Sequence, residues 1–175
     1  ILVYDIVTAG ITSEIPVGDH PNEMCLAKKG RYLYVANSQD NSVSVINTAT
    51  NKVVETLNAA LYPSAPSGST SNGIALSEDE KTLYIANADN NCIAVFDVSV
   101  TSKSKSKGFI PVGWYPTNVK VVGKKIYVTN GKGLTSYANP YGPNPVNKKQ
   151  VVLSHQGDST RPAEVQYIGS LFRGT

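Results

Sequence analysis

A tetrapeptide that occurs three times is the strongest constraint on what this chain can fold into. It reads Tyr-Val-Ala-Asn at 34–37, Tyr-Ile-Ala-Asn at 84–87 and Tyr-Val-Thr-Asn at 127–130. Each copy ends a run of alternating apolar residues, which is the pattern of a β-strand. Internal repeats at a spacing of 40 to 50 residues are typical of propellers, solenoids and arrays.

The residues around each tetrapeptide extend the repeat to four strands. A strand run and a short turn precede every copy, and an Asn- and Asp-rich turn with two further strand runs follows the first two copies. A solenoid with one strand and one helix per repeat is disfavoured, because no stretch of ten residues shows a helical period. Radially repeated four-stranded sheets are the blades of a β-propeller. The sequence therefore predicts an all-β fold, a partial β-propeller of four-stranded antiparallel blades.

The repeat predicts about three blades' worth of strands in a single partial propeller domain over residues 1–175. The expected parts are a half blade at 1–18, a blade at 19–58, a blade at 59–112 with an inserted loop at 59–70, a half blade at 113–130 and a long insertion loop at 131–175. A closed ring has four to eight blades. We therefore expect a fragment of a larger propeller, or a ring shared with another copy whose half blades protect the open strand edges.

Composition narrows the class of protein and of partner. With 41% apolar and 17% charged residues, the chain is typical of a globular β protein. The basic run at 103–107 lacks interleaved aromatic residues, so nucleic acid is not an expected partner. No run of 18 apolar residues occurs, so no membrane span is expected. Cys25 and Cys92 lie in separate strand runs, which indicates buried free thiols rather than a disulfide or metal site.

The topology of a four-stranded blade predicts where a site would lie. We call the strands a to d from the channel outward, so the d-to-a and b-to-c connections emerge on one face. Both long insertions fall on that face, where function concentrates in rigid scaffolds. We expect a ligand or a protein partner there. The candidate binding residues are His20, Asn22, Asn72, Trp114, Tyr115, Thr117, Asn130 and Lys132.

The chemistry of these residues leaves several interpretations open. Aromatic rings, amides and hydroxyls suit a polar or ring-shaped ligand or a protein partner better than a metal ion, so neither a metal nor another cofactor is expected. Asn130 recurs with Asn37 and Asn87 in every repeat, which favours structural turn capping over ligand binding. Trp114 is either an exposed anchor or packed under the long insertion. His20 lacks an obvious catalytic partner, which favours a structural role over a place in a pore-mouth site. No catalytic residues can be assigned from this pattern.

The repeats resemble the YVTN-type, surface-layer-like β-propeller repeats of bacteria and archaea over residues 1–130. A narrower resemblance rests on the segments 113–117, 130–133, 139–145 and 167–175. These are similar to the propeller half of bacterial two-part proteins in which a phosphoesterase domain of the alkaline phosphatase superfamily follows. The resemblance implies a periplasmic, cell-surface or secreted location. It also implies that any phosphoesterase domain would follow Thr175.

Three functions are compatible with these observations. The leading prediction is a non-catalytic β-propeller binding or scaffold module of a bacterial cell-envelope or secreted protein. The alternative is the accessory N-terminal part of a metal-dependent phosphoesterase. The third is a lactonase-like propeller enzyme, which would need inward Glu, Asn and Asp side chains in a metal-binding channel. Glu23, at the start of an inner strand, is the candidate carboxylate for that interpretation. Whether the protein is an enzyme stays open at this point.

Overall fold

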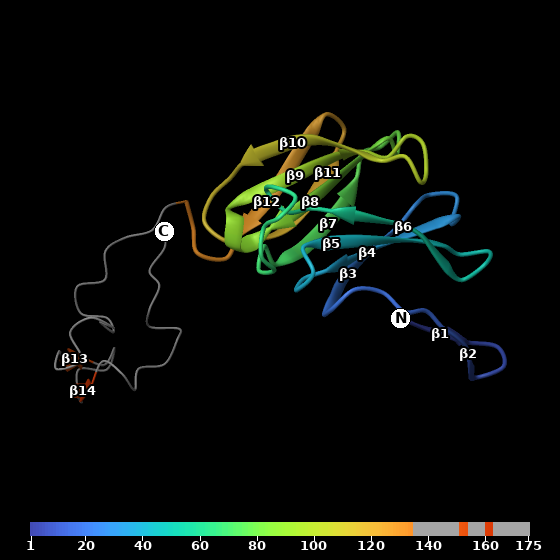
Figure 1. Ribbon diagram of the computed structural model, residues 1–175, viewed down its shortest axis with the longest axis horizontal. Helices are drawn as coiled ribbons and strands as arrows, with labels where there is room; N and C mark the ends of the chain where they lie inside the picture. Colours follow the sequence, from blue (N-terminus) through green and yellow to red (C-terminus); the bar gives the residue numbers. More distant parts are fainter. Residues whose placement is uncertain (135–150, 154–159, 163–175) are drawn as a thin grey trace. The chain divides into compact units, whose positions relative to one another are not determined.

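The computed structural model describes residues 1–134, 151–153 and 160–162. The chain divides into two compact units, Ile1–Gly131 and Lys132–Thr175. The first unit consists of antiparallel sheets, shown in blue to orange in Figure 1. The second unit contains one described hairpin, β13 (Val151–Leu153) with β14 (Thr160–Pro162). Apart from residues 131–134, the rest of the predicted insertion at 131–175, including the segments 139–145 and 167–175, lies outside the described residues.

The first unit contains two complete blades. The first blade consists of β3 (Pro21–Leu26), β4 (Tyr32–Asn37), β5 (Ser42–Asn47) and β6 (Lys52–Asn58). The second consists of β7 (Ser71–Leu76), β8 (Thr82–Asn87), β9 (Cys92–Asp97) and β10 (Lys105–Pro111), with the short 3₁₀ helix η1 (Ala88–Asn90) after β8. In both blades, strands that are consecutive in the sequence pair antiparallel with each other. The predicted partial propeller with four-stranded antiparallel blades is confirmed.

A two-stranded sheet stands at each end of this series. β1 (Leu2–Asp5) pairs with β2 (Gly10–Glu14), and β11 (Pro116–Val122) pairs with β12 (Lys125–Asn130). In the repeat, the first pair corresponds to strands c and d and the second pair to strands a and b. The tetrapeptides end β4, β8 and β12, which are all b strands.

The inner strands lie side by side, with β7 between β3 and β11 (Figure 1). Their approach is close enough to require a glycine. A Cβ atom at Gly73 would lie 2.7 Å from the Cα of Asn118 and 3.1 Å from the carbonyl oxygen of Thr117. Real Cβ atoms do not approach backbone so closely, so the absence of a side chain at Gly73 allows β7 and β11 to pack.

The alternating strand residues fill the space between successive sheets. Tyr34 and Ala36 of β4 pack in one cluster with Ile85 of β8, so this face of the first blade meets the second blade. Val35, which points the other way, packs with Ile15 near the β1–β2 pair. The first blade has a sheet packed against each of its faces, so side chains on both faces of β4 are buried. Its sequence is therefore apolar at successive positions, instead of alternating between apolar and polar residues.

Candidate functional site

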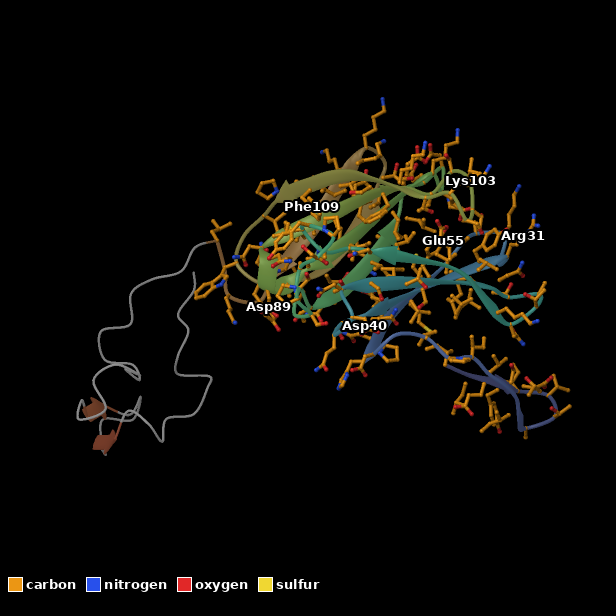
Figure 2. All side chains as sticks on the ribbon, in the orientation of Figure 1. Arg31, Asp40, Glu55, Asp89, Lys103 and Phe109 are labelled. Carbon is orange, nitrogen blue, oxygen red and sulfur yellow. The ribbon has the colours of Figure 1, made fainter. Side chains whose placement is uncertain are left out.

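The connections predicted to share a face do so in the structure. Asn41, in the β4–β5 turn, holds the β6–β7 loop: its Oδ1 accepts from the N–H groups of Gly68 (3.0 Å) and Ser69 (2.6 Å). Figure 2 shows Asp40 and Asp89 at this end of the blades and Arg31, Glu55 and Lys103 at the other end. We call the end with the β2–β3, β4–β5, β6–β7, β8–β9 and β10–β11 connections the loop face.

Each inner strand is entered through a residue in the left-handed backbone region. His20, Thr70 and Tyr115 have φ of 51°, 52° and 62°. This conformation is uncommon for residues other than glycine. In each case the residue's carbonyl accepts a hydrogen bond from the first residue after the tetrapeptide. These bonds are Ser38 N to His20 O at 3.0 Å, Ala88 N to Thr70 O at 3.0 Å and Gly131 N to Tyr115 O at 2.8 Å.

A bulge follows at the start of every inner strand. The pairing register shifts between Pro21 and Met24, between Ser71 and Gly73, and between Pro116 and Asn118. Bulges re-aim side chains and are common beside active sites. The bulged residues include three of the predicted site residues. Asn22 Nδ2 donates to Asn72 Oδ1 at 3.0 Å, and the hydroxyls of Thr117 and Thr129 are 2.8 Å apart.

Glu23 joins the three inner strands. Its Oε2 accepts from the N–H of Ile74 on β7 at 3.1 Å, and its Oε1 accepts from Lys120 Nζ on β11 at 3.1 Å. The Glu23 side chain is 24% exposed, whereas that of Lys120 is 63% exposed. Sequence reasoning identified Glu23 but missed Lys120. Lys120 is a charged residue between two valines of a predicted inner strand, and this interruption of the apolar run was the available signal for it.

The asparagines of the tetrapeptide have structural contacts. Asn37 and Asn87 are fully buried. The amide of Asn37 donates to two serine hydroxyls of β5, both at 2.9 Å. Asn87 donates to the carbonyl of Ala59 at 2.6 Å and accepts from the hydroxyl of Ser71 at 3.0 Å. Asn130 is half-buried, and its Oδ1 has no hydrogen-bond partner among the described residues. The side-chain amides of Asn37 and Asn87 therefore bond to serine side chains and, for Asn87, to the β6–β7 connection. They do not cap the backbone of the turn that follows them.

The other predicted residues are not gathered into one cluster. His20 is exposed, with its Nδ1 3.1 Å from Asp19 Oδ1, so it does have a neighbouring carboxylate. Trp114 and Tyr115 are half-buried, and the N–H of Tyr115 donates to Asn91 Oδ1 at 2.9 Å. Lys132 belongs to the second unit.

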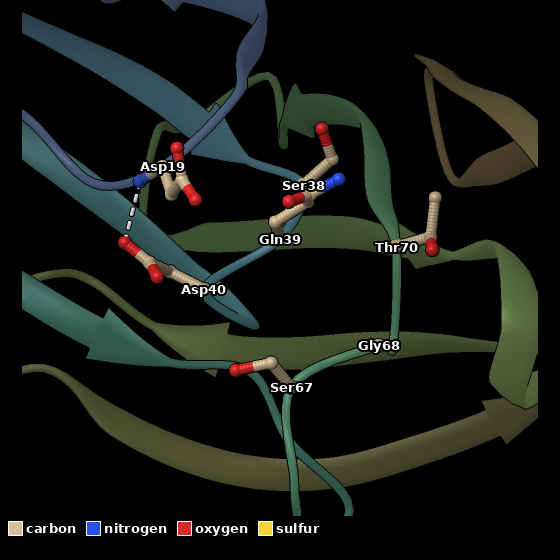
Figure 3. A pocket seen from close by; sticks show the side chains of 7 residues that line it. All are labelled: Asp19, Ser38, Gln39, Asp40, Ser67, Gly68 and Thr70. Atoms are coloured by element: carbon tan, nitrogen blue, oxygen red, sulfur yellow. Dashed lines mark hydrogen bonds between the residues drawn. The ribbon is translucent and has the colours of Figure 1, made fainter.

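A cavity of about 350 Å³ opens on the loop face. Figure 3 shows the lining residues, which come from three connections: Asp19, Ser38, Gln39, Asp40, Ser67, Gly68 and Thr70. The N–H of Asp19 donates to Asp40 Oδ2 at 2.5 Å, the dashed line of that figure. The hydroxyl of Thr70 donates to Asp89. This face thus carries carboxylates as well as amides and hydroxyls. Residues 1–134, 151–153 and 160–162 contain no group of three or more His, Cys, Asp or Glu that could hold a metal ion.

Shifted pKa values occur away from this cavity. Hydrogen bonds from Thr8 and Val7 hold the pKa of Asp5 below its usual value, and the hydroxyl of Ser77 does the same for the pKa of Asp79. Burial raises the pKa of the Cys25 thiol. None of these groups lines the cavity.

The fold defines this chain as part of a β-propeller whose inner strands carry polar side chains. Residues 3–136 match the family described as Lactonase, 7-bladed beta-propeller. Since this match covers most of the sequence, the chain belongs to that lactonase family.

Solved structures support the same fold. Hydrazine synthase from Kuenenia stuttgartiensis is 26% identical with a TM-score of 0.60, over 73% of this chain and 34% of that one. A putative 6-phosphogluconolactonase from Bacteroides fragilis is 18% identical with a TM-score of 0.57, over 83% and 38%. The periplasmic gluconolactonase of Pseudomonas aeruginosa is 17% identical with a TM-score of 0.57, over 83% and 39%. The chain thus spans less than half of each of these structures. No curated protein matches it significantly.

The family assignment corrects the functional prediction. The prediction of a non-catalytic scaffold module, with a phosphoesterase accessory part as the alternative, is wrong, because the family that matches residues 3–136 is described as a lactonase. The comparisons support the propeller fold but neither the YVTN-type nor the phosphoesterase resemblance. The expectation of no membrane span agrees with the described residues, which include no helix of sufficient length and apolarity to cross a bilayer.

Proposed function

We propose that this chain is part of a lactonase-type enzyme that opens a cyclic ester at the inner strands of the loop face. The observation that carries the proposal is the family match over residues 3–136. That range contains all three inner strands and the Glu23–Lys120 pair. The expected periplasmic, cell-surface or secreted location stays a prediction, and the periplasmic gluconolactonase among the neighbours is compatible with it.

The reaction needs a base, a positive charge and groups that hold the ring. A water oxygen attacks the lactone carbonyl, the ring C–O bond breaks, and the water's proton ends on the released hydroxyl. In our proposal Glu23 takes the proton from water and returns it to the leaving oxygen, which is general acid–base catalysis. The Lys120 ammonium stabilises the negative charge that develops on the carbonyl oxygen. The amides of Asn22 and Asn72 bind hydroxyls of the substrate.

The structure supports this assignment of roles through the contacts of Glu23. One carboxylate oxygen is oriented by the backbone N–H of Ile74 and the other by Lys120. Each oxygen has further lone-pair capacity for a water molecule. Asn22 and Glu23 both lie within the bulge between Pro21 and Met24, and Asn22 is bonded to Asn72. Base, cation and amides therefore come from three adjacent strands, as a site assembled in a propeller channel requires.

The substitution Glu23→Gln tests this proposal in the protein at its natural length. Hydrolysis of glucono-δ-lactone and of its 6-phosphate is followed by the release of acid. If Glu23 is the base, kcat falls by roughly 100-fold or more while KM changes little, because the amide has the same shape but cannot accept the proton.

Glu14→Gln is the matched control, because Glu14 is an exposed carboxylate on the outer strand β2. It should retain the original kcat. Both variants are compared by thermal unfolding, so that a loss of activity is not a loss of fold. Retention of full kcat by Glu23→Gln would exclude the assigned role.

A further inference from the structure

The loop face of the first unit is acidic. Among the residues of its five connections, the charged side chains are Asp19, Asp40 and Asp89, and the one basic group is His20. His20 is already beside Asp19. The next cation along the inner strands, Lys120, is engaged by Glu23. Carboxylates therefore outnumber basic groups on the loop face, where a substrate would enter this part of the ring.

The cavity beside the inner strands adds neutral polar groups to these charges. Its walls carry the hydroxyls of Ser38, Ser67 and Thr70 and the amide of Gln39, together with Asp19 and Asp40. Asp19 stands three residues before Asn22, and Thr70 stands two residues before Asn72. Two of the cavity's lining residues thus lie two or three positions along the chain from the bonded Asn22–Asn72 pair. Hydroxyl, amide and carboxylate groups are suited to the hydroxyls of a sugar-like molecule, since each can accept a hydrogen bond from them.

We infer that the substrate of the proposed lactonase site is an uncharged polyhydroxylated lactone, and that the cavity holds its hydroxyl-bearing part. This inference rests on the proposed function. The two kinds of lactone named for the neighbouring structures differ by one phosphate group. A phosphate carries nearly two negative charges at neutral pH. Asp19 and Asp40 repel such a group, whereas an uncharged lactone meets only hydrogen-bonding groups.

The size of the effect follows from Coulomb's law. Two carboxylates within several ångströms of a phosphate, in a solvent-exposed cavity, disfavour its binding by about tenfold. The Debye length is about 8 Å at physiological ionic strength, so added salt weakens this repulsion. The preference for the uncharged lactone should therefore fall as the salt concentration rises.

The test compares kcat/KM for glucono-δ-lactone and 6-phosphoglucono-δ-lactone, using the protein at its natural length. We expect the uncharged lactone to be preferred by about tenfold or more. The double variant Asp19→Asn with Asp40→Asn should raise the ratio of kcat/KM for the phosphorylated lactone to kcat/KM for the uncharged lactone by about tenfold. In this variant the amide oxygen introduced at position 40 can still accept the hydrogen bond that Asp40 Oδ2 accepts from the N–H of residue 19.

The matched control is Asp79→Asn with Asp97→Asn, which removes the same charge from the β7–β8 turn and from the last residue of β9, at the opposite end of the blade. It should leave the ratio of the two kcat/KM values unchanged. A preference for the phosphorylated lactone, or an equal response to both double variants, would overturn the inference while leaving the lactonase proposal intact.

Hydrolysis of neither lactone would instead count against the proposed function. Binding then decides the inference separately, with glucitol and glucitol 6-phosphate as probes that cannot be hydrolysed. Tighter binding of glucitol that is reversed in the double variant of Asp19 and Asp40 supports a cavity for uncharged polyols. Tighter binding of the phosphate, or no binding of either probe, overturns it.

Discussion

The two complete blades share one architecture and differ where the site is proposed. Their tetrapeptides end β4 and β8 in the same register, and both blades bury the final asparagine. Fifty residues apart, at the matching position of the inner strand, however, the first blade has Glu23 and the second has Gly73. The repeat therefore determines the scaffold, while the chemistry depends on residues that break the repeat.

The two departures depend on each other. A Cβ at Gly73 would approach the carboxylate of Glu23 to 3.2 Å and the Cα of Asn118 to 2.7 Å. The missing side chain in the second blade thus leaves room for the long side chain of the first, which crosses β7 to reach Lys120 on β11. Three predictions test this comparison between the blades.

The largest effect is expected from Gly73→Ala. The new methyl group meets the backbone of Asn118, which cannot rotate away, so the inner strands must separate. We expect a loss of about 3 kcal/mol in the free energy of unfolding, measured by urea denaturation. Gly10→Ala is the control, since a Cβ there has no neighbour within 4 Å. Equal stability of the two variants would mean that close packing at Gly73 is not required.

A smaller effect should separate the two buried asparagines. Asn87→Ala leaves the carbonyl of Ala59 and the hydroxyl of Ser71 without their partner, which should cost about 2 kcal/mol. Asn37→Ala should cost about 1 kcal/mol, because the Oδ1 of Asn37 already lacks a partner among the described residues. Both values are measured by urea denaturation. A larger loss for Asn37→Ala would show that the amide of the first blade has the more important contacts.

The smallest effect concerns the tyrosine with which each tetrapeptide begins. Burial, with the nearby charge of Glu55, raises the pKa of Tyr34 to about 12 from an ordinary value of 10.0. The folded state therefore favours the neutral phenol, so this contribution to stability is complete below pH 10 and is lost as the pH rises towards 12. At pH 11 the loss amounts to about 1 kcal/mol relative to pH 8.

Tyr34→Phe should remove this alkaline loss, measured as the difference in unfolding free energy between pH 8 and pH 11. Tyr84→Phe is the matching substitution in the second blade and should retain the loss that Tyr34 causes. If both variants lose stability as much as the original protein does, Tyr34 is not the group responsible.

Sequence reasoning was most successful where neighbours along the chain decide the structure. The alternating residues before Asn37 and Asn87 predicted strands, and the recurrence of the tetrapeptide every 40 to 50 residues predicted blades. The same topology predicted that Asn22 and Asn72 lie on one face, where the structure shows them hydrogen-bonded. That these residues bind a ligand stays a prediction. The functional class was missed, because the repeat is shared by propellers whatever they do.

The sequence by itself determined the strand pattern, the four-stranded unit and the face on which the long connections gather. These depend on side-chain alternation and turn residues, which act over a few positions. Only the tertiary structure decided that Glu23 meets Lys120, that Gly73 must lack a side chain, and that Asp19 and Asp40 share a cavity. Each of these contacts joins separate strands or connections. Their geometry depends on the distance between packed blades and on the positions of the strand bulges. No local pattern in the chain encodes either of these.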